Sequence, residues 1–307
     1  MPLHPEAQHL LAALAEENVP PFEEMTVEDA RASAKGFAEL QGDPVELASV
    51  VDRTIPGPAG DVPVRIYTPE GDGPLPVIVY FHGGGWVIGD IEVSDKPCRQ
   101  LAAAAGAVIV SVEYRLAPEH RYPAAFEDCY AATAWVAGHA DELGVDASKL
   151  AVSGDSAGGN LAAVVALAAH NQGGPAISAQ VLLYPVTNPD FNTESYLSNA
   201  DGYLLTRGSM QWFWAHYLGD QDADQYAAPL RAESLEGLPP TYLATAEFDP
   251  LRDEGESYGK RLADSGVSVT SARFDGMVHG FFWTLAATPS ASHVVDDIVA
   301  FLRGVWN

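Results

Sequence analysis

The feature that most restricts the fold of this chain is a serine flanked by glycines at the junction of two regular elements. Residues 154–158 read G-D-S-A-G, after the apolar run 150–153 and at the start of the alanine-rich stretch 157–170. The run predicts a short buried strand and the alanines predict a helix. So abrupt a turn needs glycine on both flanks of Ser156, and it would lift the serine hydroxyl above the sheet beside the helix amides.

Strand and helix patterns alternate along the chain from about residue 48. Continuous apolar runs such as residues 76–81 are typical of strands buried on both faces of a mostly parallel sheet. The other predicted strands are 62–67, 107–112, 180–184, 241–246 and 267–274, and the other predicted helices are 124–139, 252–264 and 290–303. This alternation predicts the α/β class, with a doubly wound, mostly parallel sheet.

Two segments depart from the alternation. Residues 1–46 are helical in pattern, with apolar residues at i, i+3, i+4 and i+7 from Ala7, a break at two prolines, and Thr26 placed to cap a second helix. We expect them to be an appendage to a core domain of residues 47–307. A second helical element, inserted at residues 190–224, is rich in aromatic residues.

A glycine-rich loop directly follows the strand that ends at residue 81. Residues 82–86 read H-G-G-G-W. Acyl transfer passes through a tetrahedral oxyanion that needs preorganised donors, and glycines leave backbone N–H groups unobstructed. We expect the N–H groups of Gly83, Gly84 and Ala157 to form this oxyanion hole. A phosphate-binding loop is disfavoured, because neither G-x-x-x-x-G-K-[ST] nor a G-x-G-x-x-G that opens a helix is present.

A serine hydroxyl needs a base to accept its proton, and the base needs an acid to orient it. With the chain order Ser, acid, His, the base must follow the loop that carries the acid. His279 lies between the last predicted strand and the last helix, whereas His293 lies inside that helix and His216 in the aromatic insertion. His279 is therefore the predicted base.

The acid should come from the loop at the carboxyl end of the predicted strand 241–246. Asp249 occupies that position. Asp253 falls in the first turn of the next helix, where an acidic side chain usually serves the helix dipole. Asp249 is therefore preferred over Asp253 and over the two other candidates, Glu247 and Asp275.

These motifs together resemble the signatures of the bacterial hormone-sensitive-lipase family of esterases. Residues 82–86 and 154–158 carry the likeness, supported by Y-R-L-A-P-E-H-R-Y-P-A-A-F at 114–126 and D-P-L-R-D-E-G at 249–255. The resemblance extends from about residue 50 to the end of the chain.

The resemblance implies an α/β-hydrolase fold with a helical cap built from residues 1–46 and about 188–225. It also implies a metal-independent serine carboxylesterase that hydrolyses short- to medium-chain acyl esters and needs no cofactor. Aromatic residues near the motifs would line the substrate pocket, with simple core packing as the alternative; the candidates are Trp86, Trp212, Phe213 and Phe281.

Several polar residues beside the motifs are expected to act in structure rather than in catalysis. Asp155 should order the turn around Ser156, and Arg115, Glu119 and His120 should form a buried polar network that supports the site. No His, Cys, Asp or Glu cluster has the spacing of a metal site. Both cysteines, Cys98 and Cys129, should be buried free thiols; they are too few for a disulfide framework.

The composition of the chain restricts the classes of molecule that it is expected to bind. The formal net charge of -26 makes a surface that repels phosphate backbones and anionic lipids, which argues against nucleic-acid and membrane partners. No apolar run of membrane-spanning length and no signal-peptide pattern is present, so we expect a cytoplasmic protein. The expected partner is a small-molecule ester, and a homodimer is left open.

Two alternatives use the same residues. An amidase or lactonase would share the triad and differ only in its pocket. A small-molecule receptor that binds without turnover is a non-enzymatic alternative, and the intact Ser156, Asp249 and His279 argue against it.

Overall fold

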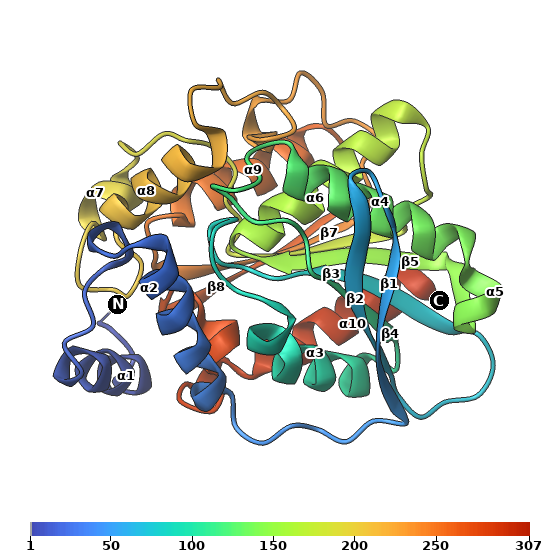
Figure 1. The fold of residues 1–307 in the computed structure, drawn as a ribbon, viewed down its shortest axis with the longest axis horizontal. Coiled ribbons are helices and arrows are strands. Elements are labelled where there is room, and N and C mark those ends of the chain that lie inside the picture. Colours follow the sequence, from blue (N-terminus) through green and yellow to red (C-terminus); the bar gives the residue numbers. More distant parts are fainter. Residues whose placement is uncertain (1) are drawn as a thin grey trace.

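The computed structural model describes residues 2–307, in which one eight-stranded sheet lies between two layers of helices (Figure 1). The strands are β1 (Ser49–Gly57), β2 (Gly60–Thr68), β3 (Leu75–Phe81), β4 (Val108–Val112), β5 (Val145–Asp155), β6 (Ala179–Leu183), β7 (Thr241–Phe248) and β8 (Val269–Val278). They are ordered β1-β2-β4-β3-β5-β6-β7-β8. The pairs β1–β2 and β2–β4 are antiparallel, and every later pair is parallel, as predicted for a doubly wound sheet.

The α-helices are α1 (Pro5–Glu16), α2 (Val27–Ala34), α3 (Ile91–Ala105), α4 (Ala124–Gly138), α5 (Ala140–Leu143), α6 (Ala157–Gln172), α7 (Glu194–Ser198), α8 (Arg207–Leu218), α9 (Arg252–Asp264) and α10 (His293–Trp306). Short 3-10 helices are η1 (Phe22–Glu24), η2 (Lys35–Gln41), η3 (Pro229–Arg231), η4 (Phe281–Thr284) and η5 (Pro289–Ala291). No helix within residues 2–307 combines the length and the apolar character that a membrane span requires.

The central strands bury both faces, and each face has its own core. Along β3, Val77 and Val79 pack into the core on the side of α4 and α6, while Ile78 and Tyr80 pack into the core on the side of α3 and α10. All four residues are fully buried. Full burial of an aliphatic side chain stabilises a fold by about 1.5–3 kcal/mol, so each residue of the apolar runs contributes to the stability of the sheet.

The structure contains one long helix that the sequence patterns do not predict. Helix α3 begins after Asp90, whose side chain accepts a hydrogen bond from the Val93 N–H at 2.8 Å. Pro97 lies inside the helix, and charged residues precede it, which together obscure the apolar periodicity. Burial of the face that includes Cys98 and Leu101 outweighs this local penalty.

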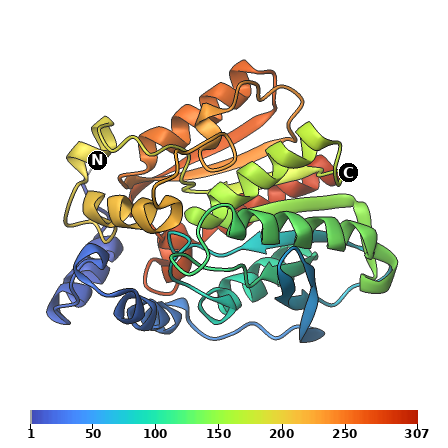
Figure 2. The same ribbon diagram turned by 45° about the horizontal axis from the view of Figure 1, so that its top comes forward.

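The two segments that break the α/β alternation lie at the same end of the molecule. Figures 1 and 2 both show the N-terminal helical segment, in blue, at the same end of the molecule as α7 and α8, in yellow and gold. As predicted, Thr26 caps α2, accepting a hydrogen bond from the Asp29 N–H at 3.1 Å. The Glu23 carboxylate joins the two segments by accepting hydrogen bonds from Thr206 Oγ1 at 2.7 Å and Ser209 Oγ at 2.5 Å.

The turn between β5 and α6 is packed against the backbone of β3. A Cβ atom on Gly158 would lie 1.9 Å from the Phe81 carbonyl oxygen, and a Cβ atom on Gly154 would lie 2.3 Å from the Gly158 carbonyl carbon. Both distances are well below van der Waals contact, and the neighbouring atoms belong to rigid backbone. Glycine is therefore required on both sides of Ser156, as the motif predicts.

We predict that Gly158→Ala destabilises the fold by about 3 kcal/mol or more, because the added methyl group displaces β3 or α6. Gly304→Ala is the matched control, since Gly304 is an exposed helical glycine and an added methyl group there would have no atom within 4 Å. It should stabilise α10 by about 0.5–1 kcal/mol. Urea unfolding followed by circular dichroism measures both, and equal stability of the two variants would contradict the packing argument.

Candidate active site

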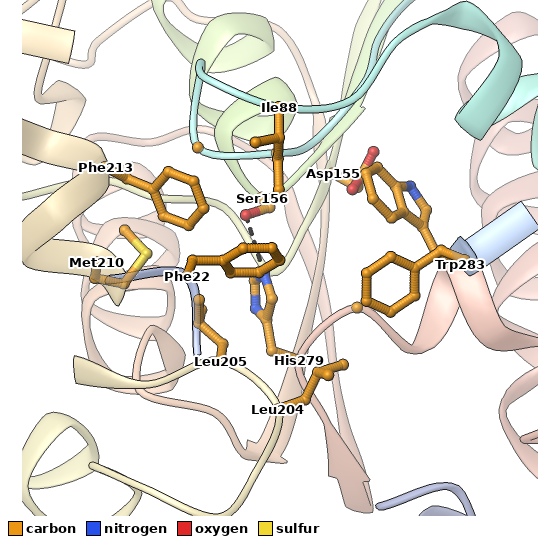
Figure 3. Close-up of a pocket in the computed structure, with 14 residues that line it drawn as sticks. Phe22, Ile88, Asp155, Ser156, Leu204, Leu205, Met210, Phe213, His279 and Trp283 are labelled. Carbon is orange, nitrogen blue, oxygen red and sulfur yellow. Dashed lines mark hydrogen bonds between the residues drawn. The ribbon is translucent and has the colours of Figure 1, made fainter. Parts of the chain in front are cut away.

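The structure brings Ser156, His279 and Asp249 together, although they follow three different strands. Ser156 follows β5, Asp249 follows β7 and His279 follows β8, so parallel strands deliver all three to one edge of the sheet. His279 Nε2 lies 3.0 Å from Ser156 Oγ (Figure 3). His279 Nδ1 lies 2.7 Å from Asp249 Oδ2. Asp249 is fully buried, while Ser156 and His279 retain 7% and 8% exposure. The serine and the histidine can thus meet a ligand, and the carboxylate cannot.

Ser156 has a backbone conformation that few non-glycine residues adopt. Its φ is 55° and its ψ is -118°, which costs on the order of 1–3 kcal/mol. The Ser156 N–H donates to the Leu183 carbonyl at 2.8 Å, and the Ser156 carbonyl accepts from Val186 at 3.2 Å. These contacts with the end of β6 hold the strained residue in place.

The loop that carries Asp249 is fixed by hydrogen bonds to the inserted segment. Asp249 Oδ1 accepts from the Leu251 N–H at 2.8 Å, and the Asp249 carbonyl accepts from Asn199 Nδ2 at 3.2 Å. Ser195 Oγ donates to the Pro250 carbonyl at 2.6 Å. Asp253 accepts from the Ser195 N–H at 2.8 Å and lies in the first turn of α9, as predicted.

Tyr184 completes the surroundings of His279, and no sequence motif indicates it. Its ring meets the imidazole edge-on at a centroid distance of 4.7 Å. Burial holds the pKa of Tyr184 well above its usual range. The ring therefore acts as a neutral wall that limits the orientations open to His279.

The structure corrects one predicted oxyanion-hole residue. The Gly83 N–H donates to Asp155 Oδ1 at 2.9 Å and is therefore not available to an oxyanion. Gly84 and Gly85 line the same cavity as Ser156, and within residues 2–307 neither N–H has a hydrogen-bond partner. Ala157 is the first residue of α6, where a helix leaves its N–H groups unpaired. The available donors are thus Gly84, Gly85 and Ala157, one residue further along the glycine loop than expected.

Asp155 links the nucleophile turn to the glycine loop. Its Oδ1 atom accepts a hydrogen bond from Tyr80 Oη at 2.6 Å in addition to the one from Gly83. Burial raises the pKa of Asp155, and the hydrogen bond from Tyr80 opposes that rise. A Cβ atom on Gly83 would lie 2.2 Å from Asp155 Oδ2, so the first glycine of the loop is needed for this contact.

An apolar cavity opens over Ser156. Figure 3 shows Phe213 and Met210 on one side of the serine and Trp283 on the other. The lining residues are Phe22, Phe37, Gly84, Gly85, Ile88, Asp155, Ser156, Leu204, Leu205, Met210, Phe213, His279, Gly280 and Trp283. The cavity wall is thus built from both segments that break the α/β alternation as well as from the core loops.

Of the four predicted pocket residues, only Phe213 lines this cavity. Trp86 is fully buried and stacks on Tyr217 at a centroid distance of 4.1 Å. Phe281 is fully buried against Tyr184 and Phe274. These two predictions were wrong because tertiary packing, which the sequence pattern does not report, turns both rings into the core.

Trp212 was the third wrong pocket prediction. It is not among the residues that line the cavity, and its ring packs against Phe213 at a centroid distance of 5.2 Å and against His216 at 4.4 Å. Met210, three positions before Phe213 on α8, also lines the cavity. Residues three apart share one face of a helix, so this spacing in the sequence indicates a shared cavity-facing side. The lining residues Phe22, Phe37, Leu204, Leu205 and Trp283 lie outside the catalytic motifs and carry no comparable signal.

The predicted buried network of Arg115, Glu119 and His120 does not form. Arg115 pairs with Asp128 through two hydrogen bonds of 2.8 Å. Glu119 is 54% exposed and pairs with Arg31 of α2, and His120 is exposed.

Cys98 and Cys129 are buried free thiols, as predicted. Across residues 2–307, no group of three or more His, Cys, Asp or Glu side chains could hold a metal ion.

Comparison with known proteins places the chain among esterases. A family model described as the α/β-hydrolase fold matches residues 78–283. Esterase LipI of Mycobacterium tuberculosis is 46% identical, with 83% of this chain and 82% of that protein covered. The carboxylic ester hydrolase LipN of the same organism is 43% identical, with 89% of this chain and 75% of that protein covered. The crystal structure of a thermostable esterase from Pseudomonas putida superimposes with a TM-score of 0.93 at 42% identity, covering 100% of this chain and 98% of that one.

A buried carboxyl group next to the acid loop makes the stability of this fold depend on pH. Glu254 is 2% exposed, and its Oε1 atom accepts hydrogen bonds from the N–H groups of Thr187 and Asn188. Burial raises the pKa of Glu254 from 4.5 to about 8, and the nearby Asp249 charge adds to the rise. Between those two values the unfolded carboxyl has lost its proton and the folded one retains it, so unfolding releases a proton and stability falls as the pH rises.

We predict that Glu254→Gln removes this pH dependence, because the amide oxygen can still accept both hydrogen bonds and cannot titrate. The stability difference between variant and wild type should grow by up to about 1.4 kcal/mol per pH unit between pH 4.5 and 8 and then level off. Glu236→Gln, at an exposed glutamate, is the control and should change stability little at any pH. Urea unfolding at pH 5, 7 and 9 measures this, and a pH-independent difference for Glu254→Gln would contradict it.

Proposed function

The chain belongs to the hormone-sensitive-lipase type of the α/β-hydrolase family, and on that premise we propose that it is a carboxylesterase that acts through Ser156, His279 and Asp249. One observation carries the proposal: the unbroken contact chain from Ser156 Oγ through both nitrogens of His279 to Asp249. Its relatives at 43–46% identity are named as a carboxylic ester hydrolase and an esterase, which supports the same chemistry.

The proposed reaction begins with proton transfer from Ser156 to His279. The imidazole tautomer with its proton on Nδ1 donates to Asp249 and leaves Nε2 to accept the serine proton. Ser156 Oγ then attacks the ester carbonyl carbon, and the carbonyl oxygen gains the negative charge of a tetrahedral intermediate. The N–H groups of Gly84, Gly85 and Ala157 stabilise that charge. His279 returns the proton to the leaving alcohol, and a water molecule activated by His279 then hydrolyses the acyl-enzyme.

We infer that residues 1–46 and about 188–225 act as a cap over this site. Phe22 and Phe37 come from the first segment, and Leu204, Met210 and Phe213 come from the second. An enclosure of this kind takes up an apolar acyl or alcohol chain, and each methylene group buried contributes about 0.8 kcal/mol. Packed side chains limit the length of the chain that fits. The resemblance to hormone-sensitive-lipase-type esterases implies short- to medium-chain acyl esters, and we propose these as substrates, with an optimum at about four to eight carbons.

We predict that Ser156→Ala lowers kcat by several orders of magnitude and that Asp249→Asn lowers it by about 10⁴, because the amide no longer fixes the His279 tautomer. Asp253→Asn is the matched control: it removes a neighbouring carboxylate that contacts Ser195 and not His279. Hydrolysis of p-nitrophenyl butyrate measures all three. A larger loss for Asp253→Asn than for Asp249→Asn would show that the acid is wrongly assigned.

We also predict that Phe213→Ala shifts the acyl-chain optimum to longer p-nitrophenyl esters, since removal of the ring lengthens the cavity. Trp212→Ala is the control on the same helix, because its ring lies outside the cavity, and it should leave the optimum unchanged. The measurement is kcat/KM from acetate to palmitate. A shift caused by Trp212→Ala and not by Phe213→Ala would contradict the assigned lining.

A further inference from the structure

The loop that carries two of the proposed oxyanion donors has a strained backbone. Gly84, Gly85 and Trp86 have φ values of 115°, 57° and 60°, three consecutive residues in a region that L-amino acids with side chains rarely occupy. The N–H groups of Val87 and Ile88 both donate to the Gly84 carbonyl, which closes a tight turn. Such a conformation persists only where surrounding contacts hold it.

Helix α8 holds one side of this loop. A Cβ atom on Gly85 would lie 2.2 Å from the Phe213 ring, so the ring sits directly on the backbone. The Trp86 ring lies parallel to Tyr217, with an angle of 5° between their planes, and also contacts Trp214 at 4.7 Å. Trp86 is thus an anchor for the loop rather than a pocket residue.

Arg31 of helix α2 holds the other side. Its Nε atom donates to the Val87 carbonyl at 2.9 Å, and its Nη2 atom donates to the Ala117 carbonyl at 3.0 Å. The Ala117 N–H in turn donates to the Trp86 carbonyl at 2.9 Å. Arg31 therefore links the glycine loop to the segment of Ala117, next to the backbone hydrogen bond that already joins them. It also fixes the position of the Val87 carbonyl, which ends the strained turn.

Glu119 orients the guanidinium group. Its two oxygens accept hydrogen bonds from Arg31 Nη1 at 2.9 Å and Nη2 at 2.7 Å, in the paired arrangement that sets the plane of an arginine. The Glu119 side chain is 54% exposed and the Arg31 side chain 31% exposed, and an ion pair in such a position adds little stability by itself. The contacts that distinguish Arg31 are those to the two backbone carbonyls.

We propose that Arg31 is a positioning residue for the oxyanion hole, acting through the Val87 carbonyl on the N–H groups of Gly84 and Gly85. This rests on the proposed function, because those N–H groups matter only if an oxyanion forms at Ser156. Donors aimed at a developing charge act on the transition state more than on the bound substrate. Loss of Arg31 should therefore lower kcat and leave KM nearly unchanged.

The test compares Arg31→Met with Arg261→Met. Methionine keeps the aliphatic stem and removes every donor. Arg261 is the matched control, since it also binds two backbone carbonyls, those of Leu230 and Ala232, away from the site. With p-nitrophenyl butyrate, Arg31→Met should lower kcat about 10- to 100-fold with KM within about three-fold of wild type. Butylboronic acid, which forms a tetrahedral adduct with a serine, should bind more weakly by the same factor.

Arg31→Lys provides a second variant if Arg31→Met does not fold. Lysine offers one donor nitrogen where Arg31 uses Nε and Nη2 for two separate carbonyls, so kcat and boronate affinity should fall by an intermediate factor. A kcat loss no larger than that of Arg261→Met, or a kcat loss with unchanged boronate affinity, would overturn the proposal. Wild-type protein that hydrolyses no ester would instead overturn the proposed function, so the two failures are distinguishable.

Discussion

The turn between β5 and α6 is the constraint on which the rest of the site depends. It holds Ser156 at a φ of 55°, and it brings α6 so close to β3 that Gly158 has no room for a methyl group. The same closeness places the first amide of α6 beside the serine and the glycine loop after β3 opposite it. Asp155 then ties the turn to that loop through the Gly83 N–H. One backbone geometry thus sets the position of the proposed nucleophile and of its donors.

The segments outside the α/β core line the cavity over Ser156, and they also form hydrogen bonds and packing contacts with the loops of the site. Asn199 and Ser195 hydrogen-bond to the loop that carries Asp249, and Phe213 packs on the glycine loop. Arg31 reaches that loop from the opposite side. The two segments that shape the cavity therefore also hold the loops of the proposed catalytic groups, and Phe213 does both. Changes in these segments should affect rate as well as substrate choice.

Sequence predicts those parts of this structure that depend on local geometry. The G-D-S-A-G turn, the strands around it and the positions of Asp249 and His279 at strand ends all follow from spacing and chain order. The sequence prediction places the available donors in H-G-G-G-W one residue too early. The reason is that the Gly83 N–H already donates to the carboxylate of Asp155, 72 positions away in the chain. Trp86, Trp212 and Phe281 were assigned to the pocket wrongly, since the direction of an aromatic ring is decided by tertiary packing. Phe22 and Phe37 could not be found, because their place over Ser156 depends on how a distant segment docks.

The central claim is that Ser156 Oγ attacks the carbonyl carbon of an ester while His279 accepts the serine proton. Diethyl p-nitrophenyl phosphate tests this most directly, because it phosphorylates an activated serine in a step that needs no turnover. We expect one equivalent of p-nitrophenol released per chain, loss of esterase activity in parallel, and a diethylphosphoryl group that peptide mass spectrometry locates at Ser156. Labelling of another serine, or inactivation without modification of Ser156, would contradict the claim.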